Sequence, residues 1–132
     1  MIVDSSAIVA MLREEPEVDA MIKAIGNADK ASISAANYLE ASIVIDDKRN
    51  PVLSANLDRL LTKFSIDIAP VTATQAKLAR QAYRDFGKGS GHPARLNFGD
   101  CFAYALAIER GEPLLYKGED FAHAGIARVA VV

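Results

Sequence analysis

The 132-residue sequence has a single cysteine, no tryptophan and no long hydrophobic run. Cys101 has no partner for an intramolecular disulfide, which excludes a disulfide-stabilised scaffold. No uncharged stretch reaches the roughly 18 residues that a membrane-spanning helix needs. The first residues, MIVD, have neither the basic flank nor the apolar core of a signal peptide. We therefore expect a soluble, cytoplasmic protein with no membrane partner.

The sequence also lacks an excess of charge of either sign. Fifteen Lys and Arg residues against seventeen Asp and Glu residues give a net charge of −2, which excludes a protein that is basic over its whole surface. A local basic patch is still compatible with this balance. Because a chain of this length buries roughly two thirds of its unfolded surface in one core, we expect residues 1–132 to form a single domain.

Short apolar or β-branched segments alternate with longer segments of helical periodicity. This alternation predicts a three-layer α/β/α sandwich with a short, mostly parallel central sheet. The predicted strands are residues 2–3, 31–33, 67–71, 113–116 and 128–132. Helices are predicted after Ser5 or Ser6 and over residues 15–26, 34–46, 57–64, 74–86 and 99–110.

Four acidic residues lie shortly after predicted strands or in the helices beside them. Asp4 follows the first strand, Glu40 lies two turns into the helix after the second, Asp100 opens the most apolar helix, and Asp120 follows the fourth strand. Each acid alone has a simpler interpretation: a helix cap, a side chain at the rim of an apolar stripe, or a surface turn. Together they are expected at the carboxyl edge of the sheet, where α/β proteins form their sites.

Carboxylates that meet at one edge repel one another unless a cation lies between them. Mg²⁺ and Mn²⁺ prefer oxygen ligands of this kind. A divalent ion held there can activate water and stabilise charge on a phosphodiester group. The acids therefore predict a magnesium or manganese site with hydrolytic chemistry.

Four segments of the chain resemble those of the PIN-domain ribonucleases, and more narrowly those of the VapC-type toxins of toxin–antitoxin pairs. The segments are MIVDSSA (1–7), SAANYLE (34–40), LNFGDC (96–101) and LLYKGEDF (114–121). The resemblance implies a metal-dependent endoribonuclease whose catalytic and metal-binding residues are Asp4, Glu40, Asp100 and Asp120. It also implies a homodimer that a cognate antitoxin holds inactive. One departure is that Ala124-Gly125 stands where many relatives have Thr-Asp, so any contact made by those side chains is missing.

Further candidates surround the acids. Ser5 and Asn97 are expected to support the site by bonding to bound water or to the scissile phosphate, although both residue types also bond to local backbone at helix starts. Lys88 and Arg95 lie in a loop with three glycines, and they are expected to contact RNA phosphates together with Arg13 and Lys117.

Two other functions stay open at this point. A receiver-like phospho-acceptor domain also gathers acids at the end of a parallel sheet, but it needs an acceptor Asp after a middle strand, and the segment 67–71 is followed by none. A catalytically silent PIN-like binding module would keep the acids only for contacts with protein partners.

Overall fold

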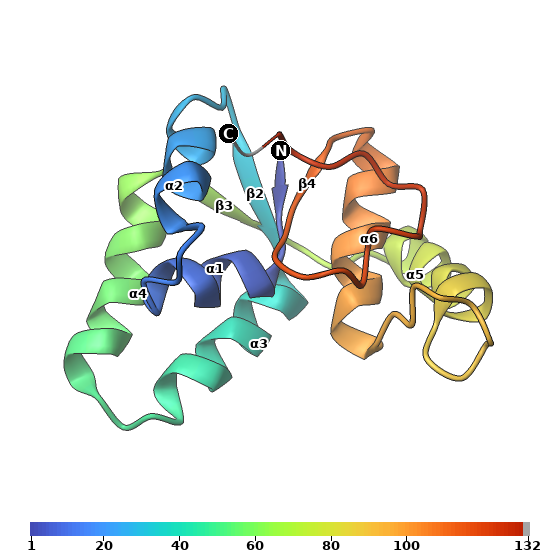
Figure 1. Ribbon diagram of the computed structural model, residues 1–132, viewed down its shortest axis with the longest axis horizontal. Coiled ribbons are helices and arrows are strands. Elements are labelled where there is room, and N and C mark those ends of the chain that lie inside the picture. Colours follow the sequence, from blue (N-terminus) through green and yellow to red (C-terminus); the bar gives the residue numbers. More distant parts are fainter. Residues whose placement is uncertain (131–132) are drawn as a thin grey trace.

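A computed structural model describes residues 1–130. A sheet of four parallel strands, in the order β3-β2-β1-β4, lies between two groups of helices (Figure 1). The strands are β1 (Ile2–Val3), β2 (Ala31–Ser34), β3 (Ile66–Ala69) and β4 (Leu114–Leu115). The helices are α1 (Ser5–Leu12), α2 (Val18–Gly26), α3 (Ala35–Asp46), α4 (Pro51–Lys63), α5 (Ala73–Phe86) and α6 (Phe98–Arg110). The predicted three-layer fold is confirmed.

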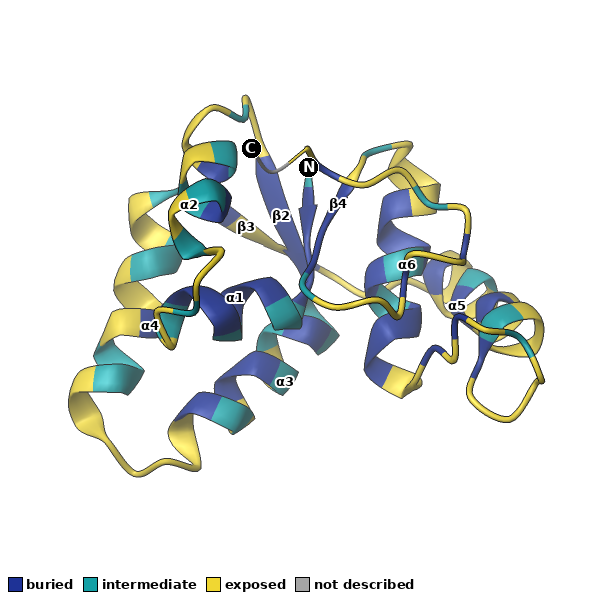
Figure 2. Ribbon diagram, viewed as in Figure 1, coloured by how far each residue is buried: buried dark blue, intermediate teal, exposed yellow. Residues whose placement is uncertain are grey.

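Each face of the sheet has its own hydrophobic cluster. Val3 and Leu115 pack with α1 to α4, whereas their neighbours Ile2 and Leu114 pack with α5 and α6. Successive strand residues point to opposite faces, so a strand of two apolar residues serves both clusters. Figure 2 shows the result: β1, β2 and β4 are buried, the edge strand β3 is partly exposed, and most other exposed residues lie in loops and on the outer faces of the helices.

Helix caps place three of the acid-bearing segments. Asp4, and not Ser5 or Ser6 as predicted, caps α1, because its Oδ2 accepts a hydrogen bond from the Ser6 N–H at 3.0 Å. Ser34 caps α3 as predicted. Asn97 caps α6, and Asp100 in the first turn completes a reciprocal capping box with it. Three functional candidates are thus fixed by backbone hydrogen bonds.

The predicted fifth strand is wrong over the described residues. Arg128 forms an isolated parallel bridge to Leu114, and residues 126–130 otherwise lack strand structure. Residues 131–132 of that prediction lie outside the described part of the chain. Within residues 1–130, none of the helices combines the length and the apolar character needed to cross a membrane.

Candidate active site

The strand order reverses between β1 and β4, because the chain runs from β1 through β2 to β3 and then returns to the other side of β1. A crevice at the carboxyl ends of such strands is the usual ligand site of an open α/β sheet. A cavity of about 450 Å³ lies there, and we call it the acidic cavity. Its lining includes Asp4, Glu40, Asp100, Asp120, Ser5, Asn97, Arg13 and Lys117. The structure thus brings eight of the ten candidate residues together.

Asp4 lies at the floor of the acidic cavity, directly after β1, and is 2% exposed. Its Oδ2 is engaged in the helix cap, whereas its buried Oδ1 has no hydrogen-bond partner among the described residues. Burial raises the pKa of the Asp4 carboxyl to about 6, against the helix-start hydrogen bonds from Ser6, which lower it. An unpartnered buried oxygen of this kind is costly unless a ligand completes it.

Asp100 is 9% exposed and reaches the cavity from the first turn of α6. Its Oδ2 accepts the Asn97 N–H at 2.9 Å, and Asn97 Oδ1 accepts the Asp100 N–H at 2.9 Å. Burial raises the pKa of Asp100 to about 7, and the charges of Asp4, Asp120 and Glu40 add to the rise. Asp100 is therefore both a capping residue and a wall of the cavity.

Glu40 is half-buried and enters the cavity from α3. Its Oε1 accepts hydrogen bonds from the Ser5 hydroxyl and, at 3.4 Å, from Asn37 Nδ2. Ile43, one turn after Glu40 on α3, is 59% exposed, so an apolar stripe does not explain why Glu40 faces the cavity. Glu40 faces inward because Ser5 and Asn37 hold its carboxylate.

Asp120 is the exposed member of the four acids, in a turn after β4. Its charge nevertheless contributes to the raised pKa of Asp100. The four acids therefore act on one another electrostatically, although they come from segments far apart in the sequence.

The predicted RNA-contacting cations fall into different places. Arg13 and Lys117 line the acidic cavity, but the Lys117 ammonium pairs with Glu15 at 2.9 Å and with Glu17 at 3.4 Å. Hydrogen bonding to Glu15 raises the pKa of Lys117. Arg95 is exposed in the loop before α6 and does not line the acidic cavity.

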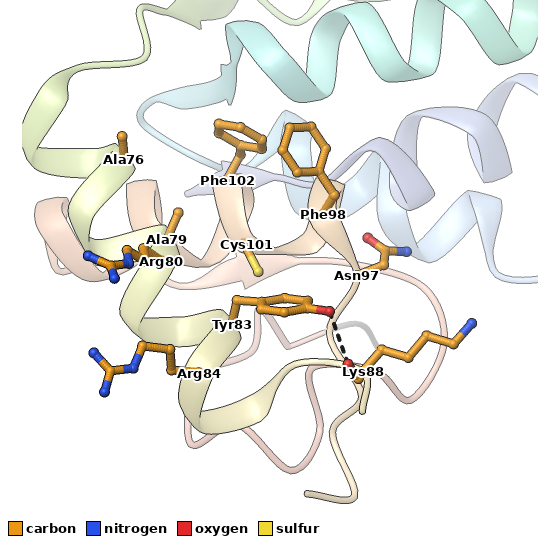
Figure 3. A pocket seen from close by; sticks show the side chains of 10 residues that line it. All are labelled: Ala76, Ala79, Arg80, Tyr83, Arg84, Lys88, Asn97, Phe98, Cys101 and Phe102. Carbon is orange, nitrogen blue, oxygen red and sulfur yellow. Dashed lines mark hydrogen bonds between the residues drawn. The ribbon is translucent and has the colours of Figure 1, made fainter. Parts of the chain in front are cut away.

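Lys88 lines a second cavity of about 780 Å³, which we call the α5–α6 cavity. Figure 3 shows Phe98 and Phe102 pointing from α6 to the same side, Arg84 extending from α5, and the Tyr83 hydroxyl donating to the Lys88 carbonyl. Asn97 lines both cavities. The two cavities therefore share the start of α6.

Sequence reasoning missed three residues of the acidic cavity or its wall. Asn37 is fully buried and joins Glu40 to the backbone of Gly99, and Glu15 holds Lys117. Two signals were available in the sequence. Asn37 lies one turn before Glu40 on the same helical face, and Gly99 is a glycine within the first turn of a predicted helix. The ion pair of Glu15 left no signal, because its partner lies about a hundred residues away.

The donor set of the acidic cavity fits a hard divalent cation. Its carboxylates supply oxygen ligands, and Asp4 Oδ1 is a buried oxygen with no partner in the described chain. Among residues 1–130, no three His, Cys, Asp or Glu side chains are grouped closely enough to form a ready-made metal cluster. Mg²⁺ does not need one, because it usually keeps several waters beside one or two carboxylates.

Comparison with known proteins decides the family. The sequence profile of the PIN domain matches residues 1–127. This chain is a PIN-domain protein. Ribonuclease VapC28 from Mycobacterium tuberculosis is 58% identical to this PIN domain over 128 residues, which cover 97% of this chain and 96% of the relative. Ribonuclease VapC42 from the same species is 47% identical over 126 residues, covering 96% of each chain.

Solved structures share the fold of this PIN domain. VapC20 from Mycobacterium tuberculosis, described as a sarcin-ricin loop cleaving toxin, matches with a TM-score of 0.73 at 15% identity and covers 97% of both chains. FitAcB from Neisseria gonorrhoeae matches with a TM-score of 0.73 at 17% identity, covering 98% of this chain and 96% of the other. The match to PIN domains does not favour the receiver-like alternative.

Proposed function

We propose that this PIN domain is a metal-dependent endoribonuclease that hydrolyses RNA phosphodiester bonds and acts as the toxin of a toxin–antitoxin pair. The observation that carries the proposal is the acidic cavity, in which four carboxylates from separate segments line one space at the reversal of strand order. The identity of 47–58% to proteins named ribonucleases supports the reaction.

In this proposal Asp4, Glu40, Asp100 and Asp120 hold one or two Mg²⁺ or Mn²⁺ ions. The bound cation supplies a water of lowered pKa and neutralises charge on phosphodiester oxygens. Asp4 offers its free Oδ1, while its Oδ2 stays in the cap of α1. Asp100 is fixed by the capping box, and Ser5 orients Glu40 through its hydroxyl. The chain thus presents carboxylates on rigid helix starts, with little need to reorganise.

The substrate in this proposal is RNA, guided to the acidic cavity by the cations around it. Arg13 lines the cavity, and Lys88 lies beside the shared residue Asn97. Lys117 reaches a phosphate only by leaving its acidic partners, and Arg95 would act from the loop before α6. Because the net charge is −2, binding through so few cations should weaken as salt rises.

Protein partners complete the proposal. A cognate antitoxin would cover the acidic cavity, and a second copy of the chain would form a homodimer, with residues 1–132 acting as one PIN domain in the cytoplasm. Leu39, Ile43 and Phe98 are 58%, 59% and 78% exposed, and apolar side chains exposed in this way support contact with other proteins.

The test is cleavage of end-labelled RNA with Mg²⁺ or Mn²⁺ by the wild type and by Asp100→Asn. The cleavage rate of the variant should fall by more than about a hundredfold. Substituting a residue that only orients a metal ligand already lowers metal affinity or activity by roughly 10- to 100-fold. Its fold should persist, because an Asn side chain still accepts the Asn97 N–H. Asp58→Asn on the exposed side of α4 is the matched control and should cleave like the wild type.

Two results would contradict the proposal. Full cleavage by a folded, metal-saturated Asp100→Asn variant would remove Asp100 from the active site. A wild type that neither binds Mn²⁺ in a calorimetric titration nor cleaves RNA would be a catalytically silent binding module.

A further inference from the structure

Gly99 lies in the first turn of α6 with its α-carbon against the Glu40 carboxylate. A methyl group added to Gly99 would lie 2.6 Å from Glu40 Cδ and nearer still to Oε2. Gly99 does not have a positive φ, so the left-handed conformation that usually requires glycine is not the reason for this residue. Alanine is the better helix former, so glycine at this position weakens the start of α6 but leaves room for the Glu40 carboxylate.

A second contact fixes the same approach of α3 to α6. Asn37 is fully buried, and its Nδ2 donates to the Gly99 carbonyl at 2.9 Å and to Glu40 Oε1 at 3.4 Å. One amide group therefore joins the backbone of α6 to the carboxylate carried by α3. The free N–H groups at the start of a helix also favour a carboxylate in that place.

We infer that Gly99 is a positioning residue, which with Asn37 allows the Glu40 carboxylate to stand against the start of α6 beside Asp100. The inference rests on the proposed function, because it concerns where one of the proposed metal ligands is held. Gly99 has no side chain to offer a ligand. Its contribution is the absence of a side chain, and any larger residue displaces Glu40 from the acidic cavity.

The experiment compares Gly99→Ala with wild type in three measurements: Mn²⁺ affinity, RNA cleavage and metal-free thermal stability. The group that must move is the end of a flexible side chain, so the fold should persist and the melting temperature should stay unchanged or rise. Mn²⁺ affinity and cleavage should each fall by roughly 10- to 100-fold, the range seen when residues that orient metal ligands are changed. Gly26→Ala is the matched control, because a methyl group there meets only Phe64 at 3.9 Å.

A double-mutant cycle with Glu40→Gln separates positioning from any other role of Gly99. If Gly99→Ala acts through Glu40, it should lower Mn²⁺ affinity by less than about threefold in the Glu40→Gln background. Equal losses in both backgrounds would overturn the inference, as would a Gly99→Ala variant with wild-type affinity or one that fails to fold. A wild type that does not bind Mn²⁺ would instead refute the proposed function, before the variants are compared.

Discussion

The acidic cavity and the α5–α6 cavity share the first turn of α6 but have opposite chemistry. Asp100 faces the first cavity, whereas its neighbours Cys101 and Phe102 line the second. Consecutive helix residues point about 100° apart, so one turn forms the wall of both. Asn97 lines both cavities.

The difference between the two cavities lies in what holds their side chains. Three of the four proposed ligand carboxylates in the acidic cavity are tied to backbone or to other side chains: Asp4 to Ser6, Asp100 to Asn97, and Glu40 to Ser5. In the α5–α6 cavity, Phe98 is 78% exposed and the rim is basic. Ionisable carboxylates line the acidic cavity, whereas the α5–α6 cavity is mostly apolar, so charge effects should be largest in the acidic cavity and smaller at Cys101.

The largest expected effect is on the pH dependence of stability without metal. The raised pKa values of Asp4 and Asp100 mean that between about pH 4 and pH 7 the folded chain binds more protons than the unfolded chain. The free energy of unfolding should therefore fall as pH rises through this window. For Asp4, a rise from 3.8 to about 6 corresponds to about 3 kcal/mol.

Urea denaturation with a chelator at pH 4 and pH 7.5 measures this effect on wild type and Asp4→Asn. Asn keeps the helix cap, so the variant should match wild type at pH 4 and exceed it by about 3 kcal/mol at pH 7.5. Asp58→Asn should show no such gain, because Asp58 is exposed. If Asp4→Asn is no more stable at pH 7.5, the buried charge of Asp4 is not destabilising.

Much of the fold was predictable because its signals are local. The end of β1 before Asp4 and the cap at Ser34 follow from short-range patterns, and parallel strands bring their carboxyl ends to one edge. The shared position of Asp4, Glu40 and Asp100 could be predicted from this topology. The apolar composition of α6 indicates burial, which the structure shows at Leu106, although Phe98 at the start of the helix is exposed.

Other features depend on contacts between distant segments, which periodicity does not report. Ser5 and Asn37 hold Glu40 in its inward direction, and neither contact follows from the periodicity of α3. Nothing near Lys117 in the sequence indicates that its ammonium is already paired with Glu15. The space at Gly99 likewise appears only when α3 meets α6.

The next effect concerns Cys101, whose thiol reports on the α5–α6 cavity. Burial raises the pKa of Cys101 to about 11, and the nearby Asp100 charge adds to the rise. The thiolate is the reactive form, so iodoacetamide at pH 7.5 should alkylate folded Cys101 about a hundredfold more slowly than the unfolded chain. Intact mass spectrometry follows the single site directly, since the chain has no other cysteine.

Alkylation of Cys101 also measures how far the Asp100 charge of the acidic cavity acts on the α5–α6 cavity. Asp100→Asn removes the charge that disfavours the thiolate and should speed alkylation by a fewfold, while Asp58→Asn should not. Alkylation of the folded wild type at the rate of the unfolded chain would mean that the Cys101 side of α6 is open to solvent.

The smallest expected effect is at the rim of the acidic cavity, where Glu15 and Glu17 hold Lys117. Solvent-accessible ion pairs of this kind contribute little, so releasing the lysine should change RNA affinity by only a fewfold. In the Asp100→Asn background, which keeps RNA intact, Glu15→Gln should tighten RNA binding about two- to fivefold and steepen its salt dependence. Fluorescence anisotropy at two salt concentrations measures both. Glu119→Gln makes the same change in net charge without freeing Lys117, so an equal gain from it would assign the effect to overall charge and leave Lys117 outside the RNA path.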